Sequence, residues 1–229
     1  MPWSDPRIEP SRRQPLFNAP LLAVALAASM PILYAFQVRL ADGGLGWAFS
    51  PADLAQGRWT GLFTSMLLHA GWMHAIMNAV GALAFGAPIL RRLEGLRGAG
   101  AFLCLYIVSG MLAALGYGLV HWGASDALVG ASGGVFGLIG AAMRLEIGSG
   151  RLMPLTDRRV IQSSAGWMAA NLVIGLIGLA PGVSGGRIAW EAHAFGYVVG
   201  LLAIGPLIRW FANTKPGFDS TPRLGDPVD

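Results

Sequence analysis

Hydrophobic residues gather in six long runs along this chain, and shorter polar stretches separate the runs. Each run is comparable with the ~20 apolar residues that an α-helix needs to cross the hydrocarbon core of a bilayer. The pattern predicts an all-α fold, a polytopic membrane bundle of six transmembrane helices. The second run is long enough to begin outside the membrane, and the short fourth and fifth runs are typical of enclosed helices. The runs cover residues 20–38, 61–90, 98–120, 129–143, 165–180 and 188–211.

The runs also divide the chain into three parts. Residues 1–19 form a polar amino-terminal segment, residues 20–211 form the membrane domain, and residues 212–229 form a polar tail. The first hydrophobic run begins too late and is too long for a cleavable signal peptide. The tail has few apolar residues with which to build a core, so we expect it to be disordered.

The composition agrees with a chain that lives in a bilayer. Apolar residues make up 54% of the sequence and charged residues 12%, and the mean hydropathy is +0.56. An average soluble domain carries about twice that share of charge. A soluble globular class is therefore excluded. The single Cys104 excludes a scaffold of internal disulfides.

Basic residues are distributed unevenly between the two sides that six spans would create. Of the 16 Lys and Arg residues, only Arg39, Arg58 and Arg187 fall on one side. Because cytoplasmic loops carry the excess of basic residues, both termini are expected in the cytoplasm. The basic residues behind the net charge of +4 therefore serve as markers of membrane topology. No nucleic-acid partner is expected. Abundant arginine, alanine and glycine indicate a GC-rich bacterial genome, and hence the bacterial cytoplasmic membrane.

Polar side chains inside the runs are candidates for function, because a polar group in lipid is costly. The second run contains His69, His74 and Asn78, the fourth contains Ser132 and the sixth contains His193. Each could simply form a hydrogen bond that holds two helices together. However, at ~1.5 Å per residue, His74, Ser132 and His193 fall at a similar depth in the external half of the bundle. Independent packing contacts have no reason to share one depth, which favours a common site.

Helical periodicity adds small residues to the same faces. His74 and Asn78 lie one turn apart on a single stripe. The fourth and sixth runs each carry a GxxxG spacing, which lets two helix backbones approach closely. We interpret these glycines as packing that brings a serine hydroxyl within ~2.6–3.2 Å of an imidazole. The glycines concerned are Gly133 and Gly137 after Ser132, and Gly196 and Gly200 after His193.

Ser132 and His193 together could form a catalytic dyad. A serine is a poor nucleophile until a base removes its proton. The one carboxylate inside a run, Glu191, lies on nearly the opposite helix face from His193 and is expected to pair with Arg187. We therefore expect a dyad without a third, acidic member.

An oxyanion formed during attack by Ser132 would need hydrogen-bond donors. The amide of Asn78, the imidazole of His74 and the backbone N–H near Ser132 are candidates. This chemistry needs neither a metal nor a cofactor, and none is expected.

Three motifs resemble those of the rhomboid intramembrane serine proteases. Residues 130–137 resemble the family's GxSGxxxG motif; the second run matches HxxxxHxxxN, and the sixth matches AHxxGxxxG. The resemblance covers residues 58–202, although Arg58-Trp59 reverses a Trp-Arg pair that is common in the family's first loop. The matched residues are Gly130, Ser132, Gly133, Phe136 and Gly137; His69, His74 and Asn78; and Ala192, His193, Gly196 and Gly200.

The resemblance implies a role for each matched side chain. Ser132 would be the nucleophile, and His193 would be the general base and then the general acid. His74 and Asn78 would stabilise the oxyanion together with the backbone amide of Ser132. His69 would be a structural histidine, Phe136 would pack on the catalytic histidine, and the matched glycines would support the site.

The expected function is an intramembrane endopeptidase. Its partners would be transmembrane protein substrates in the lipid bilayer, cleaved near their external ends. A rhomboid-like protein that binds membrane clients without cutting them is an alternative, but intact Ser132 and His193 argue against it. A proton-coupled transporter could use buried histidines, but the sequence contains neither an inverted repeat nor a broken helix pair.

The charge distribution predicts the outcome of a topology assay. Reporter fusions after Arg97 and after Arg159 should read cytoplasmic, and a fusion after Trp122 should read external, because basic loops stay inside. Paired reporters that are active on opposite sides of the membrane would measure each position. An external reading after Arg159 would overturn the placement of the fourth run and the shared depth argued from it.

Overall fold

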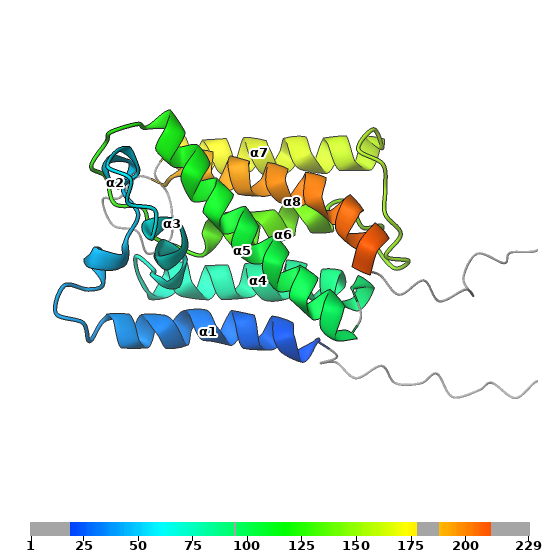
Figure 1. The fold of residues 1–229 in the computed structure, drawn as a ribbon. Helices are drawn as coiled ribbons and strands as arrows, with labels where there is room; N and C mark the ends of the chain where they lie inside the picture. The colour runs from blue at the N-terminus through cyan, green and yellow to red at the C-terminus, as the bar shows by residue number, and fades with distance from the viewer. Residues whose placement is uncertain (1–18, 94, 178–187, 212–229) are drawn as a thin grey trace, which may run out of the picture.

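The structure is a computed structural model that describes residues 19–93, 95–177 and 188–211, and these residues form an all-α bundle, as expected. The tail expected to be disordered, residues 212–229, lies outside the described residues. Figure 1 shows the long helices side by side, with short helices gathered at one end of the bundle. The elements are α1 Leu21–Gln37, η1 Leu45–Trp47, α2 Pro51–Ala55, α3 Gly61–Thr64, η2 Ser65–Leu67, α4 Trp72–Arg92, α5 Gly95–Val120, α6 Ser132–Ala142, α7 Arg158–Ile177 and α8 Trp190–Phe211.

Four helices are long and apolar enough to cross a membrane. These are α4, α5, α7 and α8, with 21, 26, 20 and 22 residues. The apolar helices α1 and α6 are shorter, with 17 and 11 residues. The chain is therefore a polytopic membrane protein, and the count of six spans stays a prediction.

The second hydrophobic run does not form one continuous helix. It begins as α3 and η2, becomes extended at Leu68 (ψ 155°), and resumes as α4 at Trp72. Nδ1 of His74 accepts a hydrogen bond from the N–H of Ala70 (3.2 Å). This backbone N–H lies just before α4, where no helical carbonyl can accept from it. His69 therefore lies in the connection before α4, and the expectation that it is inside a spanning helix is wrong.

Helix α6 lies at the centre of the bundle and contacts α4, α5 and α8. All of its residues except Ser132 and Phe136 are buried, as the expectation of an enclosed fourth helix requires. The same expectation is wrong for the fifth run. Helix α7 begins at Arg158 and is long enough to span the membrane. Only 11% of its apolar stretch is buried inside the structure. It packs on α8 at the side of the bundle opposite α1 (Figure 1).

Glycines set the distance between α6 and α8. A Cβ atom on Gly196 would overlap the backbone carbonyl of Gly133, and one on Gly200 would overlap the carbonyl of Gly137. The two GxxxG spacings therefore face each other, and the helix backbones touch where any larger residue would force them apart.

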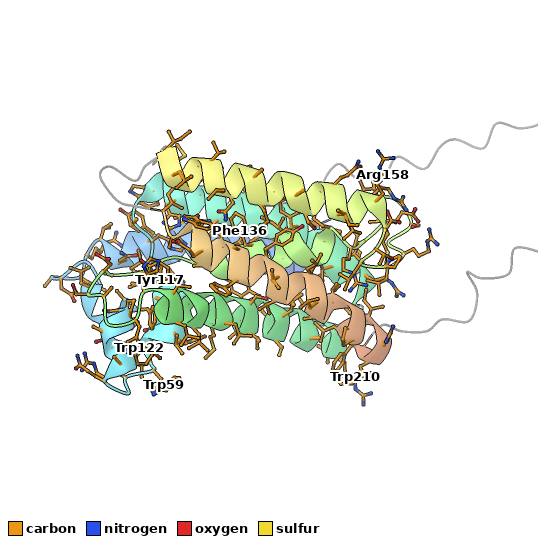
Figure 2. All side chains as sticks on the ribbon, turned by 90° about the horizontal axis from the view of Figure 1, so that it is seen from above. Trp59, Tyr117, Trp122, Phe136, Arg158 and Trp210 are labelled. Carbon is orange, nitrogen blue, oxygen red and sulfur yellow. The ribbon has the colours of Figure 1, made fainter. Side chains whose placement is uncertain are left out.

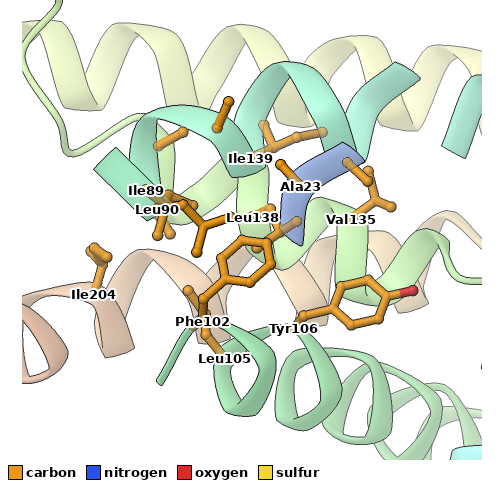
Figure 3. Close-up of a cluster of buried hydrophobic side chains, with 14 of the residues drawn as sticks. Ala23, Ile89, Leu90, Phe102, Leu105, Tyr106, Val135, Leu138, Ile139 and Ile204 are labelled. Carbon is orange, nitrogen blue, oxygen red and sulfur yellow. The ribbon is translucent and has the colours of Figure 1, made fainter. Parts of the chain in front are cut away.

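Apolar side chains fill the space between α4, α5, α6 and α8. Phe102 and Tyr106 of α5 point toward Leu138 and Val135 of α6 (Figure 3), and Phe102 is fully buried. The ring of Tyr106 covers Gly134. This apolar cluster packs against α6 and holds in place the helix that begins at Ser132.

The connections at that end support the segment leading into α6. Phe49 and Leu128 exchange two backbone hydrogen bonds, of 3.0 and 2.7 Å, as an isolated antiparallel bridge. The N–H of Gly130 donates to the carbonyl of Ser65 (2.9 Å). The residues before Ser132 are thus held by backbone contacts to the chain between α1 and α4.

Aromatic and basic residues mark the two ends of the bundle. Figure 2 shows Trp59 and Trp122 at one end, and Arg158 and Trp210 at the other. At the basic end, hydrogen bonds from Arg151 and Arg159 lower the pKa of Glu146 to about 2 and hold the loop between α6 and α7. The predicted sorting of charge, and which end of the bundle faces the cytoplasm, stay predictions.

The contact between α6 and α8 predicts a large difference between two glycine-to-alanine changes. Gly200→Ala should lower stability, since overpacking costs about 1–3 kcal/mol and the clash is with backbone. Gly166→Ala on α7 is the matched control, because a Cβ atom there meets nothing within 4 Å. Thermal unfolding in detergent would compare the two variants. Equal midpoints would show that the α6–α8 contact tolerates a methyl group.

Candidate active site

Three helices begin at the same level and carry the predicted polar residues in their first turns. Ser132 is the first residue of α6, His74 is the third of α4, and His193 is the fourth of α8. The structure thus brings residues that are far apart in the sequence to one level of the bundle.

The side chains of Ser132 and His193 form a hydrogen bond. Nε2 of His193 lies 2.8 Å from Oγ of Ser132. Phe136, one turn after Ser132, stacks on the imidazole with ring centroids 4.2 Å apart and planes 6° from parallel. The stacked ring limits the imidazole to movement in its own plane.

The other imidazole nitrogen also has a partner, which sequence reasoning missed. Nδ1 of His193 lies 2.9 Å from Oδ1 of Asn171 on α7. The Nδ2 group of Asn171 donates to the carbonyl of Trp190 (2.8 Å). A dyad without an acidic third member was expected, and the group beside Nδ1 of His193 is a neutral amide. Asn171 could have been noticed as a polar residue in the fifth run. Its burial in the membrane is as costly in free energy as that of the polar residues considered in the second, fourth and sixth runs.

Glu191 points away from this group. Its Oε1 lies 3.3 Å from Nε2 of His121, which follows the end of α5. The expected partner, Arg187, lies outside the described residues. The contact nonetheless agrees with the expectation that the Glu191 carboxylate does not reach His193.

His74 lies on the α4 side of the site, and Asn78 follows it by one turn of α4. A Cβ atom on Gly130 would lie 2.7 Å from the ring of His74 and 3.6 Å from Oγ of Ser132. Gly130 also has φ of +131°, so both its backbone and this close approach require glycine. The Asn78 side chain is buried, and its Nδ2 has no hydrogen-bond partner among the described residues.

His69 lies beside the site, in the connection before α4. Its N–H donates to Oε1 of Gln37 (2.8 Å), and Nε2 of Gln37 donates to its carbonyl (3.0 Å). Its buried ring meets the ring of His74 edge-on at 5.5 Å between centroids. This arrangement suits a residue that orients His74.

The groups gathered here suit nucleophilic chemistry. A hydroxyl is hydrogen-bonded to an imidazole, and an amide donor and a second imidazole lie on the neighbouring helix. Within the described parts of the chain, no three His, Cys, Asp or Glu side chains are placed to hold a metal ion.

Comparison with known proteins adds independent information. Residues 56–210 match the Rhomboid domain family. The chain is 31% identical over 157 residues to "Putative rhomboid protease YdcA" of Bacillus subtilis, a match covering 65% of this chain and 67% of that protein. It is 27% identical over 154 residues to "Rhomboid protease GluP" of the same organism, covering 67% of this chain and 27% of that longer protein.

Proposed function

This chain belongs to the rhomboid family, and we propose that it is an intramembrane serine endopeptidase that cleaves transmembrane segments of other membrane proteins. Ser132 is the proposed nucleophile and His193 the proposed general base. The observation that carries the proposal is the 2.8 Å hydrogen bond between Nε2 of His193 and Oγ of Ser132.

The reaction follows from that hydrogen bond. Nε2 of His193 takes the hydroxyl proton as Oγ of Ser132 bonds to the carbonyl carbon of the substrate. The same nitrogen then donates this proton to the leaving amine as the carbon–nitrogen bond breaks. A water molecule then gives a proton to Nε2 of His193 as its oxygen bonds to the acyl carbon. The bond from that carbon to Oγ of Ser132 breaks, Oγ takes the proton back from His193, and the product leaves as a carboxylic acid.

The negative charge that forms on the carbonyl oxygen needs donors already in position. The proposed donors are Nδ2 of Asn78, the imidazole of His74 and the backbone N–H of Ser132. Two features support this set. Nδ2 of Asn78 is buried with no partner among the described residues, and the first N–H groups of a helix such as α6 have no intrahelical acceptor.

The site also fits a substrate that comes from the bilayer. Ser132 lies at one end of a bundle with four membrane-length helices, so water can enter from that end while a substrate helix remains in lipid. A helical amide is shielded by its own hydrogen bonds, so the substrate must unwind locally. Residues with weak helix propensity near the cleaved bond would lower that cost.

The dyad is tested by cleavage and by chemical labelling together. Ser132→Ala should abolish both cleavage of a model transmembrane substrate and labelling by a fluorophosphonate, because it removes the nucleophile. His193→Ala should lower both steeply, because the hydroxyl keeps its proton. Glu191→Gln is the matched control and should keep most activity, since its carboxylate contacts His121.

The assay should use purified protein in liposomes. Substantial cleavage by Ser132→Ala would exclude the serine-protease mechanism. Parental protein that binds a transmembrane substrate but neither cleaves it nor reacts with the probe would favour the client-binding alternative.

The oxyanion donors are tested by separate changes. Asn78→Ala and His74→Ala should each lower kcat while the protein still folds. Loss of one oxyanion donor costs about 10²–10³ in kcat in other serine proteases, and overlapping donors should make the loss here smaller. If the single and double variants cleave at the parental rate, both residues serve packing only.

A further inference from the structure

Asn171 is a buried polar residue on a mostly exposed helix. Only 5% of its surface is accessible, whereas α7 has the lowest buried share among the four membrane-length helices. It belongs to a stripe of α7 that meets the rest of the bundle. The other members are Val160, which is buried; Ser164, hydrogen-bonded to Tyr197; Trp167, edge-on to Phe136; and Gly175, against Trp190.

The two hydrogen bonds of Asn171 determine which way its amide faces. The carbonyl of Trp190 can only accept, so the group 2.8 Å from it must be the NH₂ of Asn171. The amide oxygen then faces Nδ1 of His193 at 2.9 Å. Because that oxygen can only accept, Nδ1 must carry the proton of the neutral imidazole.

The tautomer set in this way determines the state of the other nitrogen. With the proton on Nδ1, Nε2 has a free lone pair, and that atom lies 2.8 Å from Oγ of Ser132. With the opposite tautomer, Nε2 would carry a proton and could not accept the one on Ser132. A general base requires the first arrangement.

We propose that Asn171 is a positioning residue that holds His193 in the tautomer and ring orientation able to accept the Ser132 proton. This inference rests on the proposed function. In serine proteases with a triad, the Asp beside the histidine does this work, and papain-like proteases use an Asn. A neutral amide suits a position as buried as Asn171, because an unpaired carboxylate there would cost far more to desolvate.

Asn171 and Phe136 restrict the imidazole in complementary ways. Phe136 covers one face of the ring and prevents tilting. Asn171 holds the edge and prevents rotation within the plane. The amide is itself held by Trp190, in the first turn of the helix that carries His193. Rotation of the His193 ring would therefore break its bonds to both Asn171 and Ser132.

Three variants separate positioning from helix packing. Asn171→Leu removes both hydrogen bonds and keeps the branching at Cγ and the number of side-chain heavy atoms. Asn171→Asp keeps an oxygen acceptor for Nδ1 of His193. Ser164→Ala is the matched control, because it removes the other side-chain hydrogen bond between α7 and α8, to Tyr197, without touching the histidine.

The kinetic readout is kcat and KM for a model transmembrane substrate in liposomes. General-base catalysis raises the rate ~10²–10⁴-fold, and positioning of the base contributes part of that rate enhancement. Asn171→Leu should therefore lower kcat at least about tenfold with little change in KM. Asn171→Asp should retain clearly more activity than Asn171→Leu, and Ser164→Ala should stay near the parental rate. Equal losses in Asn171→Leu and Ser164→Ala would overturn the proposal in favour of helix packing.

A second readout is independent of proteolysis. Nitrogen-15 NMR of histidine-labelled protein in detergent distinguishes the two neutral tautomers, and His193→Ala identifies the signals of that ring. The parent should show a protonated Nδ1, and Asn171→Leu should shift His193 toward a mixture of tautomers. An unchanged tautomer in Asn171→Leu would overturn the proposal. Parental protein without cleavage or labelling would instead refute the proposed function, while the NMR result would still test the role of Asn171.

Discussion

The contact between α6 and α8 is the constraint on which the candidate site depends. Gly133 and Gly137 of α6 face Gly196 and Gly200 of α8 so closely that a methyl group at either α8 position would overlap a backbone carbonyl. Backbones at this separation allow a short serine side chain to reach an imidazole on the neighbouring helix, at 2.8 Å. The same glycines therefore serve both helix packing and the contact between Ser132 and His193, because a wider spacing would separate the two side chains.

The imidazole of His193 joins three helices through its contacts. The ring is carried by α8. It contacts the hydroxyl of Ser132 and the ring of Phe136 on α6, and the amide of Asn171 on α7. Polar groups at membrane depth are costly unless they satisfy one another, so this arrangement lowers the cost of burying a histidine. It also links the position of α7, which has little buried surface, to the geometry around Ser132.

The segments at the site end of the bundle are as important as the long helices. The bridge between Phe49 and Leu128 and the bond from Gly130 to Ser65 hold the residues before Ser132. Gln37, the last residue of α1, binds both backbone polar groups of His69. These contacts hold the entry to α6 and the start of α4 in one arrangement, although none of them involves the side chain of Ser132 or His193 directly.

The sequence by itself determined the membrane class, the apolar helices, the rhomboid resemblance and the residues that share one level, because these depend on local runs and on spacing within single helices. His193, Gly196 and Gly200 fall on one face through periodicity alone. Only the tertiary structure decided that α7 is exposed, that a connection interrupts the second run at His69, and that Asn171 reaches His193. These features depend on which helix lies beside which. Spacing within one helix cannot specify a contact between residues 22 positions apart on neighbouring helices.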